Sequence, residues 1–219
     1  MRRFVIGSVT VIATLLQGSE LRAQQVSAVP FEWRAHGPSA FMQVYGPAQA
    51  PLGFLRFCEA NPEDCPADSD TKARPAASPQ RLDELDEINR RVNRLIIPVT
   101  DLAHHGVAEL WALPTDGKGD CEDYALLKRH ELLKLGWPSS ALLMTVVSDE
   151  RGEGHAVLTV RTTGGDFILD NKVDEVRIWN EAPYRFLERQ SSPNPRFWVD
   201  LDPTRNVNPQ PIAGVGTHF

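Results

Sequence analysis

The chain reads Gly119-Asp120-Cys121-Glu122-Asp123-Tyr124-Ala125 where its best-defined predicted helix begins. Asp120 suits the capping position, acidic residues occupy the first turn and basic residues come late, so the charges follow the helix dipole. Gly136 and Pro138 predict where this helix ends. The pattern therefore places the thiol of Cys121 at a helix N-terminus, where backbone N–H groups favour a thiolate.

Residues before this stretch predict further helices. Ser78 and Pro79 form a capping position and a first helical residue. An apolar stripe then runs toward a helix end before Pro98, through Leu82, Leu85, Ile88, Val92 and Leu95. A second, short helix is expected over about 102–111. Residues 24–77 are rich in proline, alanine and glycine, and we expect them to form an irregular segment around the core.

Residues after Gly136 change to the pattern of β-strands. Short runs of β-branched and apolar residues, separated by polar or glycine turns, predict strands over 141–147, 155–161 and 167–170, with two more over 176–179 and 197–199. Short turns of this kind join antiparallel strands. Helices followed by an antiparallel sheet give an α+β fold class, with the helix of Cys121 packed on the sheet.

Composition limits the class of protein. The 219 residues carry a net charge of -6 and are 42% hydrophobic, which fits one domain with extensions. An acidic balance without a broad basic surface argues against nucleic acid as a partner. We expect the domain to cover residues 78–203, and the tail over 204–219 to be loosely ordered.

The first residues have the pattern of a signal peptide. Met1-Arg2-Arg3 is positively charged, residues 4–16 are apolar, and Leu21-Arg22-Ala23 offers a cleavage site. The apolar run is too short for a comfortable membrane span, and a retained anchor is the alternative. We therefore expect residues 1–23 to be removed and the mature protein to be periplasmic.

Export changes how the three cysteines are interpreted. Cys58 and Cys65 are close enough in sequence to form a disulfide in an oxidising compartment. Cys121 is then unpaired, and it is either buried and inert or reactive. Its acidic and glycine-rich neighbours favour the reactive interpretation.

Two later motifs supply partners for this thiol. They are Gly154-His155-Ala156 and Leu169-Asp170-Asn171, each on a predicted strand. An imidazole can act as general base and acid for a cysteine, and a carboxylate can fix the tautomer of the imidazole and stabilise the imidazolium. The pattern therefore predicts a catalytic triad of Cys121, His155 and Asp170.

The register of the hairpin between these motifs leaves the acid of the triad open. A tight turn on residues 164–165 would place Asp174 opposite His155, with Asp170 on the same face but four residues away. A turn centred on residues 162–163 would instead place Asp170 opposite His155. Sequence alone does not choose between the two registers.

The acidic residues beside the thiol, Asp120, Glu122 and Asp123, should raise its pKa. A bound Ca²⁺ ion, which prefers carboxylate and carbonyl oxygens, would neutralise this cluster and fix the loop that holds Cys121. The alternative is that the three acids cap the helix and remain solvated.

These motifs resemble those of the bacterial transglutaminase-like cysteine proteinases, a family that includes the periplasmic LapG-type proteases. The resemblance covers about residues 80–180 and depends on four stretches, which are Leu110-Trp111-Ala112-Leu113-Pro114, residues 119–125, Gly154-His155-Ala156-Val157-Leu158 and Leu169-Asp170-Asn171. It implies a papain-like, transglutaminase-like fold in which Cys121 is the nucleophile, His155 the base and Asp170 the orienting acid. It also implies Ca²⁺ bound by Asp120 and Glu122, with Asp123 as a further candidate.

The resemblance further implies a substrate and a regulator. Enzymes of the LapG type are calcium-dependent endopeptidases that release large surface adhesins, under the control of an inner-membrane receptor for cyclic-di-GMP. This chain departs from them in its N-terminal segment with Cys58 and Cys65, and in the compact hairpin between His155 and Asp170.

We therefore expect a periplasmic cysteine endopeptidase that forms a thioacyl-enzyme and acts on a surface or envelope protein. One alternative is a transglutaminase, which would pass the same acyl group to an amine. The other is a binding module of the cell envelope without catalytic activity.

Overall fold

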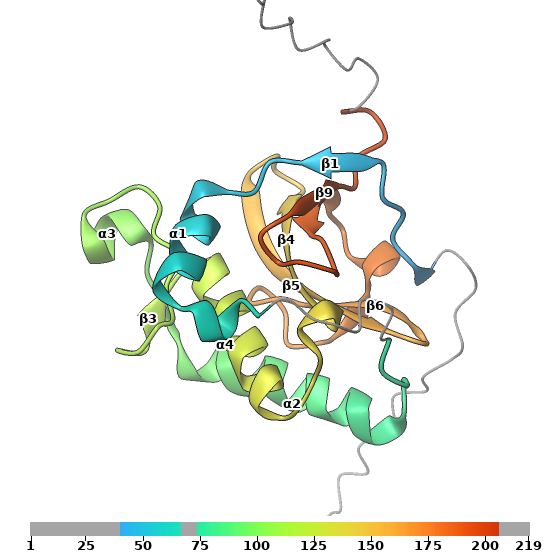
Figure 1. Ribbon diagram of the computed structural model, residues 1–219. Helices are drawn as coiled ribbons and strands as arrows, with labels where there is room; N and C mark the ends of the chain where they lie inside the picture. Colours follow the sequence, from blue (N-terminus) through green and yellow to red (C-terminus); the bar gives the residue numbers. More distant parts are fainter. Residues whose placement is uncertain (1–39, 67–73, 206–219) are drawn as a thin grey trace, which may run out of the picture. The chain divides into compact units, whose positions relative to one another are not determined.

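The computed structural model describes residues 40–66 and 74–205 (Figure 1). Its helices are α1 (Leu52–Ala60), α2 (Pro79–Leu95), α3 (Asp101–His105) and α4 (Cys121–Lys134). Its strands are β1 (Gly46–Ala48), β2 (Ile97–Pro98), β3 (Lys118–Gly119), β4 (Leu142–Ser148), β5 (Gly154–Thr162), β6 (Gly165–Leu169), β7 (Arg177–Ile178), β8 (Arg185–Gln190) and β9 (Trp198–Asp200). The predicted signal peptide and most of the predicted tail lie outside the described residues.

Seven strands form one antiparallel sheet in the order β1-β9-β8-β4-β5-β6-β7, and β2 forms a separate parallel pair with β3. The strands β4, β5 and β6 are buried along most of their length. Helix α4 packs against β4 and β5 and also against α2 (Figure 1). The predicted α+β fold class, with the helix of Cys121 packed on an antiparallel sheet, is therefore confirmed.

Helix α2 follows its predicted pattern closely. The Ser78 hydroxyl accepts a hydrogen bond from the backbone N–H of Arg81 at 3.3 Å, and Pro79 is the first helical residue. The apolar stripe is buried at Leu82, Leu85, Ile88 and Val92. Leu95 was expected in this stripe but is 58% exposed, because it lies in the last turn.

Helix α4 is enclosed on several faces. Its buried residues include four charged side chains, Glu122, Asp123, Lys128 and Arg129. The helix ends just before Gly136, whose φ of 80° lies in the left-handed region that glycine adopts without steric cost. Buried charged side chains need hydrogen-bond or ion-pair partners. The partners of these four side chains therefore affect the protonation of the groups around α4.

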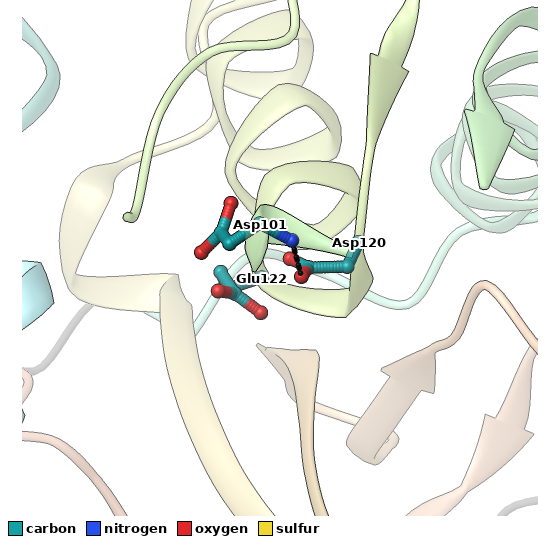
Figure 2. Close-up of side chains that lie close together, drawn as sticks. All are labelled: Asp101, Asp120 and Glu122. Atoms are coloured by element: carbon teal, nitrogen blue, oxygen red, sulfur yellow. Dashed lines mark hydrogen bonds between the residues drawn. The ribbon is translucent and has the colours of Figure 1, made fainter. Parts of the chain in front are cut away.

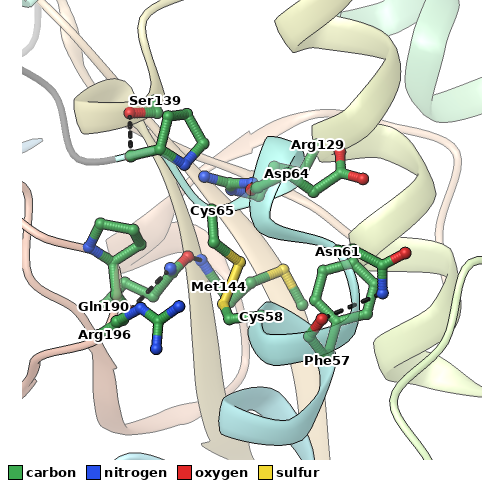
Figure 3. Close-up of a disulfide and its surroundings, with 12 residues drawn as sticks. Phe57, Cys58, Asn61, Asp64, Cys65, Arg129, Ser139, Met144, Gln190 and Arg196 are labelled. Atoms are coloured by element: carbon green, nitrogen blue, oxygen red, sulfur yellow. Dashed lines mark hydrogen bonds between the residues drawn. A yellow bond between two sulfur atoms is a disulfide. The ribbon is translucent and has the colours of Figure 1, made fainter.

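The N-terminal segment is more regular than its composition predicts. It contains β1 and α1, and the disulfide between Cys58 and Cys65 joins the end of α1 to the turn that follows (Figure 3). The ring of Phe54 packs edge-on against Trp111 and Trp198, each at 5.5 Å between centroids. A helix this short is not stable alone, so its packing and the disulfide, rather than its propensity, hold it in place.

Three further differences from the predicted elements have local causes. Helix α3 is shorter than expected because Gly106, at a φ of 72°, ends it. Strand β8 was not predicted, since its sequence is rich in charged residues. The β5–β6 hairpin pairs Leu158 with Leu169, so both registers considered from the sequence are wrong.

None of the helices in residues 40–66 and 74–205 is long and apolar enough to cross a bilayer.

Candidate active site

Cys121 is the first residue of α4, and its side chain is half-buried. Its Sγ donates a hydrogen bond to Oε2 of Glu122 at 3.2 Å. Burial raises the pKa of the Cys121 thiol, and the negative charge of Glu122 raises it further. The backbone N–H of Ala156, on β5, acts in the opposite direction by hydrogen bonding to the sulfur. The thiol therefore lies between the start of α4 and the residue that follows His155.

His155 and Asp170 form a buried pair on adjacent strands. Nε2 of His155 lies 2.9 Å from Oδ1 of Asp170, and the two residues are 4% and 2% exposed. Burial would raise the pKa of Asp170, but the hydrogen bond and charge of His155 hold that pKa below its ordinary value. A neutral imidazole that donates its Nε2–H to this carboxylate keeps the Nδ1 lone pair available for a proton.

The observed hairpin register explains how these two side chains meet. Because Leu158 pairs with Leu169, Asp170, which follows β6, lies next to Val157. Val157 is two residues from His155, so the side chains of His155 and Asp170 are on the same face of the sheet. Diagonal neighbours of this kind are within reach of a long side chain. Asp174, the other acid considered from the sequence, instead accepts a hydrogen bond from Asn93 on α2 at 3.1 Å.

Tyr184 completes the surroundings of this pair, and no sequence pattern indicated it. Its hydroxyl donates to Oδ2 of Asp170 at 2.5 Å, and its ring packs edge-on against the imidazole of His155 at 5.5 Å between centroids. Burial, followed by the hydrogen bond to Asp170, raises the pKa of Tyr184. The carboxylate also accepts from the backbone N–H of Lys172 at 3.0 Å. Asp170 thus has donors on both oxygens.

Two side chains of α2 hold the loop that follows Asp170. Asn89 donates to the backbone oxygens of Val173 and Asp174, at 3.1 and 2.9 Å. Asn93 donates to the backbone oxygens of Asp170 and Val173, at 3.0 and 3.1 Å. The position of Asp170 therefore depends on α2 as well as on the sheet.

An acidic cluster lies beside the thiol. Carboxylate oxygens of Asp101, Asp120 and Glu122 lie within 4.8 Å of one another (Figure 2). Oδ2 of Asp120 accepts from the backbone N–H of Asp101 at 3.0 Å, whereas its Oδ1 is buried without a hydrogen-bond partner among the described residues. Burial and the neighbouring Asp120 raise the pKa of Glu122 to about 9, and burial also raises that of Asp101.

The composition of this cluster differs from the prediction at two residues. Asp101 was not predicted to belong to it. Asp123 was predicted but is not in the group, because its carboxylate accepts hydrogen bonds from the backbone N–H groups of Ala112 at 2.9 Å and Asp120 at 3.3 Å. Asp123 therefore fixes the start of α4 and the segment before it.

Comparisons with known proteins identify a family for the chain. A family model described as bacterial transglutaminase-like cysteine proteinase BTLCP matches residues 44–206. A calcium-bound structure of Legionella pneumophila LapG is similar at 23% sequence identity and a TM-score of 0.48, covering 57% of this chain and 71% of that one. An EGTA-treated structure of the same protein gives 24% identity and a TM-score of 0.45, covering 52% and 64%. A comparison with curated proteins gave no match.

Proposed function

The chain belongs to the bacterial transglutaminase-like cysteine proteinases, and we propose that it is an exported endopeptidase with Cys121, His155 and Asp170 as its catalytic triad. The observation that carries this proposal is the buried hydrogen bond between His155 and Asp170, beside the helix start that holds the thiol. A nucleophile, a base and an acid that orients the base are the three parts that a cysteine peptidase needs.

The proposed reaction begins with proton transfer from the Cys121 thiol to Nδ1 of His155. The sulfur attacks the carbonyl carbon of a substrate peptide bond. The imidazolium then gives its proton to the leaving nitrogen as the C–N bond breaks, which leaves a thioester on Cys121. Among the described residues, Sγ is hydrogen-bonded to Glu122 and not to His155, so attack requires the thiol to exchange this partner for the imidazole.

Hydrolysis of the thioester completes the cycle. A water molecule gives a proton to His155 and attacks the thioester carbonyl, and the sulfur leaves and takes the proton back from the imidazolium. Asp170 keeps the imidazole oriented and stabilises its cationic form in both halves of the reaction. Backbone N–H groups at the start of α4, including that of Cys121, are the candidate donors to the oxyanion.

The residues of the acidic cluster fit a Ca²⁺ ion, and we propose Asp101, Asp120 and Glu122 as its protein ligands. Ca²⁺ prefers carboxylate oxygens, and the partnerless Oδ1 of Asp120 offers one more. When bound, the ion would supply positive charge that offsets the acids that raise the pKa of Cys121. Asp101 therefore replaces Asp123, which the sequence analysis named, as the third proposed ligand.

Two observations support export to the periplasm. The N-terminal residues have the pattern of a signal peptide. The disulfide between Cys58 and Cys65 is of a kind that persists in oxidising compartments. The proposed substrate is therefore a secreted, surface or envelope protein, with an adhesin as the first candidate and an inner-membrane receptor as the candidate regulator.

Mapping of new protein termini tests the proposed function. The purified protein and its Cys121→Ser and His155→Gln variants would each be incubated with the organism's own envelope fraction in Ca²⁺. We expect new N-termini with the wild type only. The matched control is His105→Gln, since His105 is an exposed histidine outside the site and should leave cleavage unchanged.

A labelled amine added to the same incubation separates the alternatives. Incorporation of the amine into proteins without new termini would indicate a transglutaminase. If neither product forms, or if the Cys121→Ser variant produces the same termini as the wild type, the peptidase proposal is wrong.

A further inference from the structure

Three buried polar atoms on the packed helices α2 and α4 have no hydrogen-bond partner within the described part of the chain. Lys128 on α4 is fully buried, and its Nζ has no hydrogen-bond partner among the described residues. The same is true of Oδ1 of Asn89 and Oδ1 of Asn93, both on α2. A buried donor or acceptor that is left unpaired destabilises the folded state, so one such donor and two such acceptors on helices that pack together call for a shared partner.

In both asparagines the amide nitrogen is already hydrogen-bonded, so the amide oxygen is the atom that still lacks a partner. Nδ2 of Asn89 and Nδ2 of Asn93 donate to backbone oxygens of the loop that follows Asp170. These bonds fix which end of each amide faces the loop. The opposite end, Oδ1, can only accept.

Lys128 is placed to supply the missing donor. It lies seven residues after Cys121, so the two side chains leave α4 on the same face. Helical side chains lean toward the N-terminus of their helix, and Nζ accordingly lies 5.9 Å from the ring centroid of Tyr124.

The charges around Lys128 agree with this placement. Burial lowers the pKa of Lys128 to about 7, and the nearby charges of Asp170 and Asp174 act against this shift. Asn93 donates to the backbone of Asp170 and to the side chain of Asp174, so the charges that act on Lys128 belong to the loop that Asn93 holds. An amine donates N–H bonds whether it is charged or neutral.

We propose that Lys128 is a positioning residue for the triad: through a bridging water molecule, its Nζ supplies a hydrogen bond to Oδ1 of Asn89 and Asn93. This bond locks both amides in the orientation that holds the Asp170 loop against His155. Lys128 does not touch the substrate in this arrangement. The inference rests on the proposed function in one respect, which is that Asp170 is the acid of the catalytic triad.

The tautomer of His155 tests this inference independently of any substrate. The Lys128→Met variant keeps the length of the side chain and removes the donor, and ¹⁵N-labelled histidine reports the tautomer by NMR. We expect the wild type to hold the Nε2–H tautomer. The variant should show a mixture, because the Asp170 loop is no longer fixed, with kcat up to about a hundredfold lower and KM little changed.

Arg129→Met is the matched control. Arg129 is also a buried cation of α4, but it donates to backbone oxygens of Leu142 and Asp64, away from the Asp170 loop. This variant should lower the thermal midpoint without changing the tautomer of His155. Lys128→Met should change the tautomer, and its midpoint should also fall, because two buried amide oxygens lose their donor.

A second variant keeps the inference testable if Lys128→Met does not fold. Asn93→Leu removes one acceptor and its bonds to the loop, and it should produce the same mixture of tautomers. The inference is wrong if a folded Lys128→Met variant keeps the wild-type tautomer, or if Asn93→Leu does so where Lys128→Met cannot be examined. If the wild type shows no peptidase activity, the proposed function is contradicted, but the NMR result for Lys128 still stands.

Discussion

Glu122 is the residue that most directly opposes the chemistry of its neighbour. It accepts the hydrogen bond of the Cys121 thiol, and its charge raises the pKa of that thiol. The same carboxylate belongs to the cluster that fits Ca²⁺. One side chain can therefore hold the thiol protonated and also bind the ion that reverses this effect.

Replacement of Glu122 by glutamine should separate these two roles. Above pH 9, where Glu122 is ionised in the wild type, the variant lacks one cause of the raised thiol pKa. More thiolate then exists when calcium is chelated, about tenfold more for each unit by which the thiol pKa falls. We expect faster alkylation of Cys121 by iodoacetamide above pH 9 in EGTA, and a loss of the response to added Ca²⁺. Equal or slower alkylation than in the wild type would show that the charge of Glu122 does not control the thiol.

Replacement of Tyr184 by phenylalanine should weaken catalysis while the site stays folded. The variant keeps the ring beside His155 and loses the hydrogen bond to Asp170, which is worth about 1.5 kcal/mol for a charged acceptor. We expect kcat to fall roughly tenfold with KM unchanged. Tyr45→Phe is the matched control, because Tyr45 is exposed and its hydroxyl donates to Gln43, outside the site. An unchanged kcat in Tyr184→Phe would exclude a role for this hydroxyl.

The sequence could predict the candidate triad but not its neighbours. Cys121, His155 and Asp170 each lie in a short motif whose residue types indicate their chemistry. Asp101 reaches Asp120 because β2 and β3 pair in parallel, and no local pattern predicts such a pairing. Tyr184 lies in an irregular segment before β8, so its contact with Asp170 exists only in the folded chain.

The β5–β6 hairpin illustrates why register is difficult to predict among the elements. Its turn residues are Thr163 and Gly164, and the hydroxyl of Thr162 both donates to the backbone of Gly165 and accepts from that of Gly164. A Cβ on Gly165 would lie 3.0 Å from Ile178 and 3.1 Å from the backbone of Ala40. Contacts from distant parts of the chain thus help to fix the register that aligns Asp170 with His155.

The junction of β3 and α4 requires a glycine at position 119, so a larger residue there should destabilise the protein. A Cβ on Gly119 would lie 2.7 Å from Cβ of Asp123, and the carboxylate of Asp123 holds the backbone of Ala112 and Asp120. We expect Gly119→Ala to lower the free energy of unfolding by about 1–3 kcal/mol in urea titrations. Gly154→Ala, where a Cβ meets nothing within 4 Å, should change it much less. Similar values for both variants would contradict the assigned contact.

Several distant segments meet on α4 in the whole molecule. The disulfide turn contributes Asp64, whose backbone oxygen accepts from Arg129 and whose carboxylate lies 2.6 Å from Nδ1 of His130. Composition and periodicity could predict α2, α4, the strands β4 to β6 and the α+β arrangement that they form. They could not predict that the N-terminal segment folds onto α4, because its proline-rich sequence has little structure of its own and depends on these contacts.

The acidic cluster joins two helix starts, so a bound ion should stabilise the whole domain. Asp101 begins α3, Asp120 caps α4, and Glu122 lies in the first turn of α4. The folded-state pKa of Glu122 is about 9 without an ion, above the value of about 4.3 for an unfolded chain. Folding therefore becomes less favourable as pH rises between these values, because the buried acid resists ionisation.

Calcium should offset this loss, so its stabilising effect should grow with pH. Binding requires the carboxylates to be ionised and releases their protons, and it raises the stability of the folded state by mass action. We expect the increase in thermal midpoint on addition of Ca²⁺ over EGTA to be larger at pH 8 than at pH 6. Asp101→Asn should remove most of it, and Asp116→Asn, an exposed acid outside the cluster, should not. An increase that is independent of pH, or that persists in Asp101→Asn, would place the ion elsewhere.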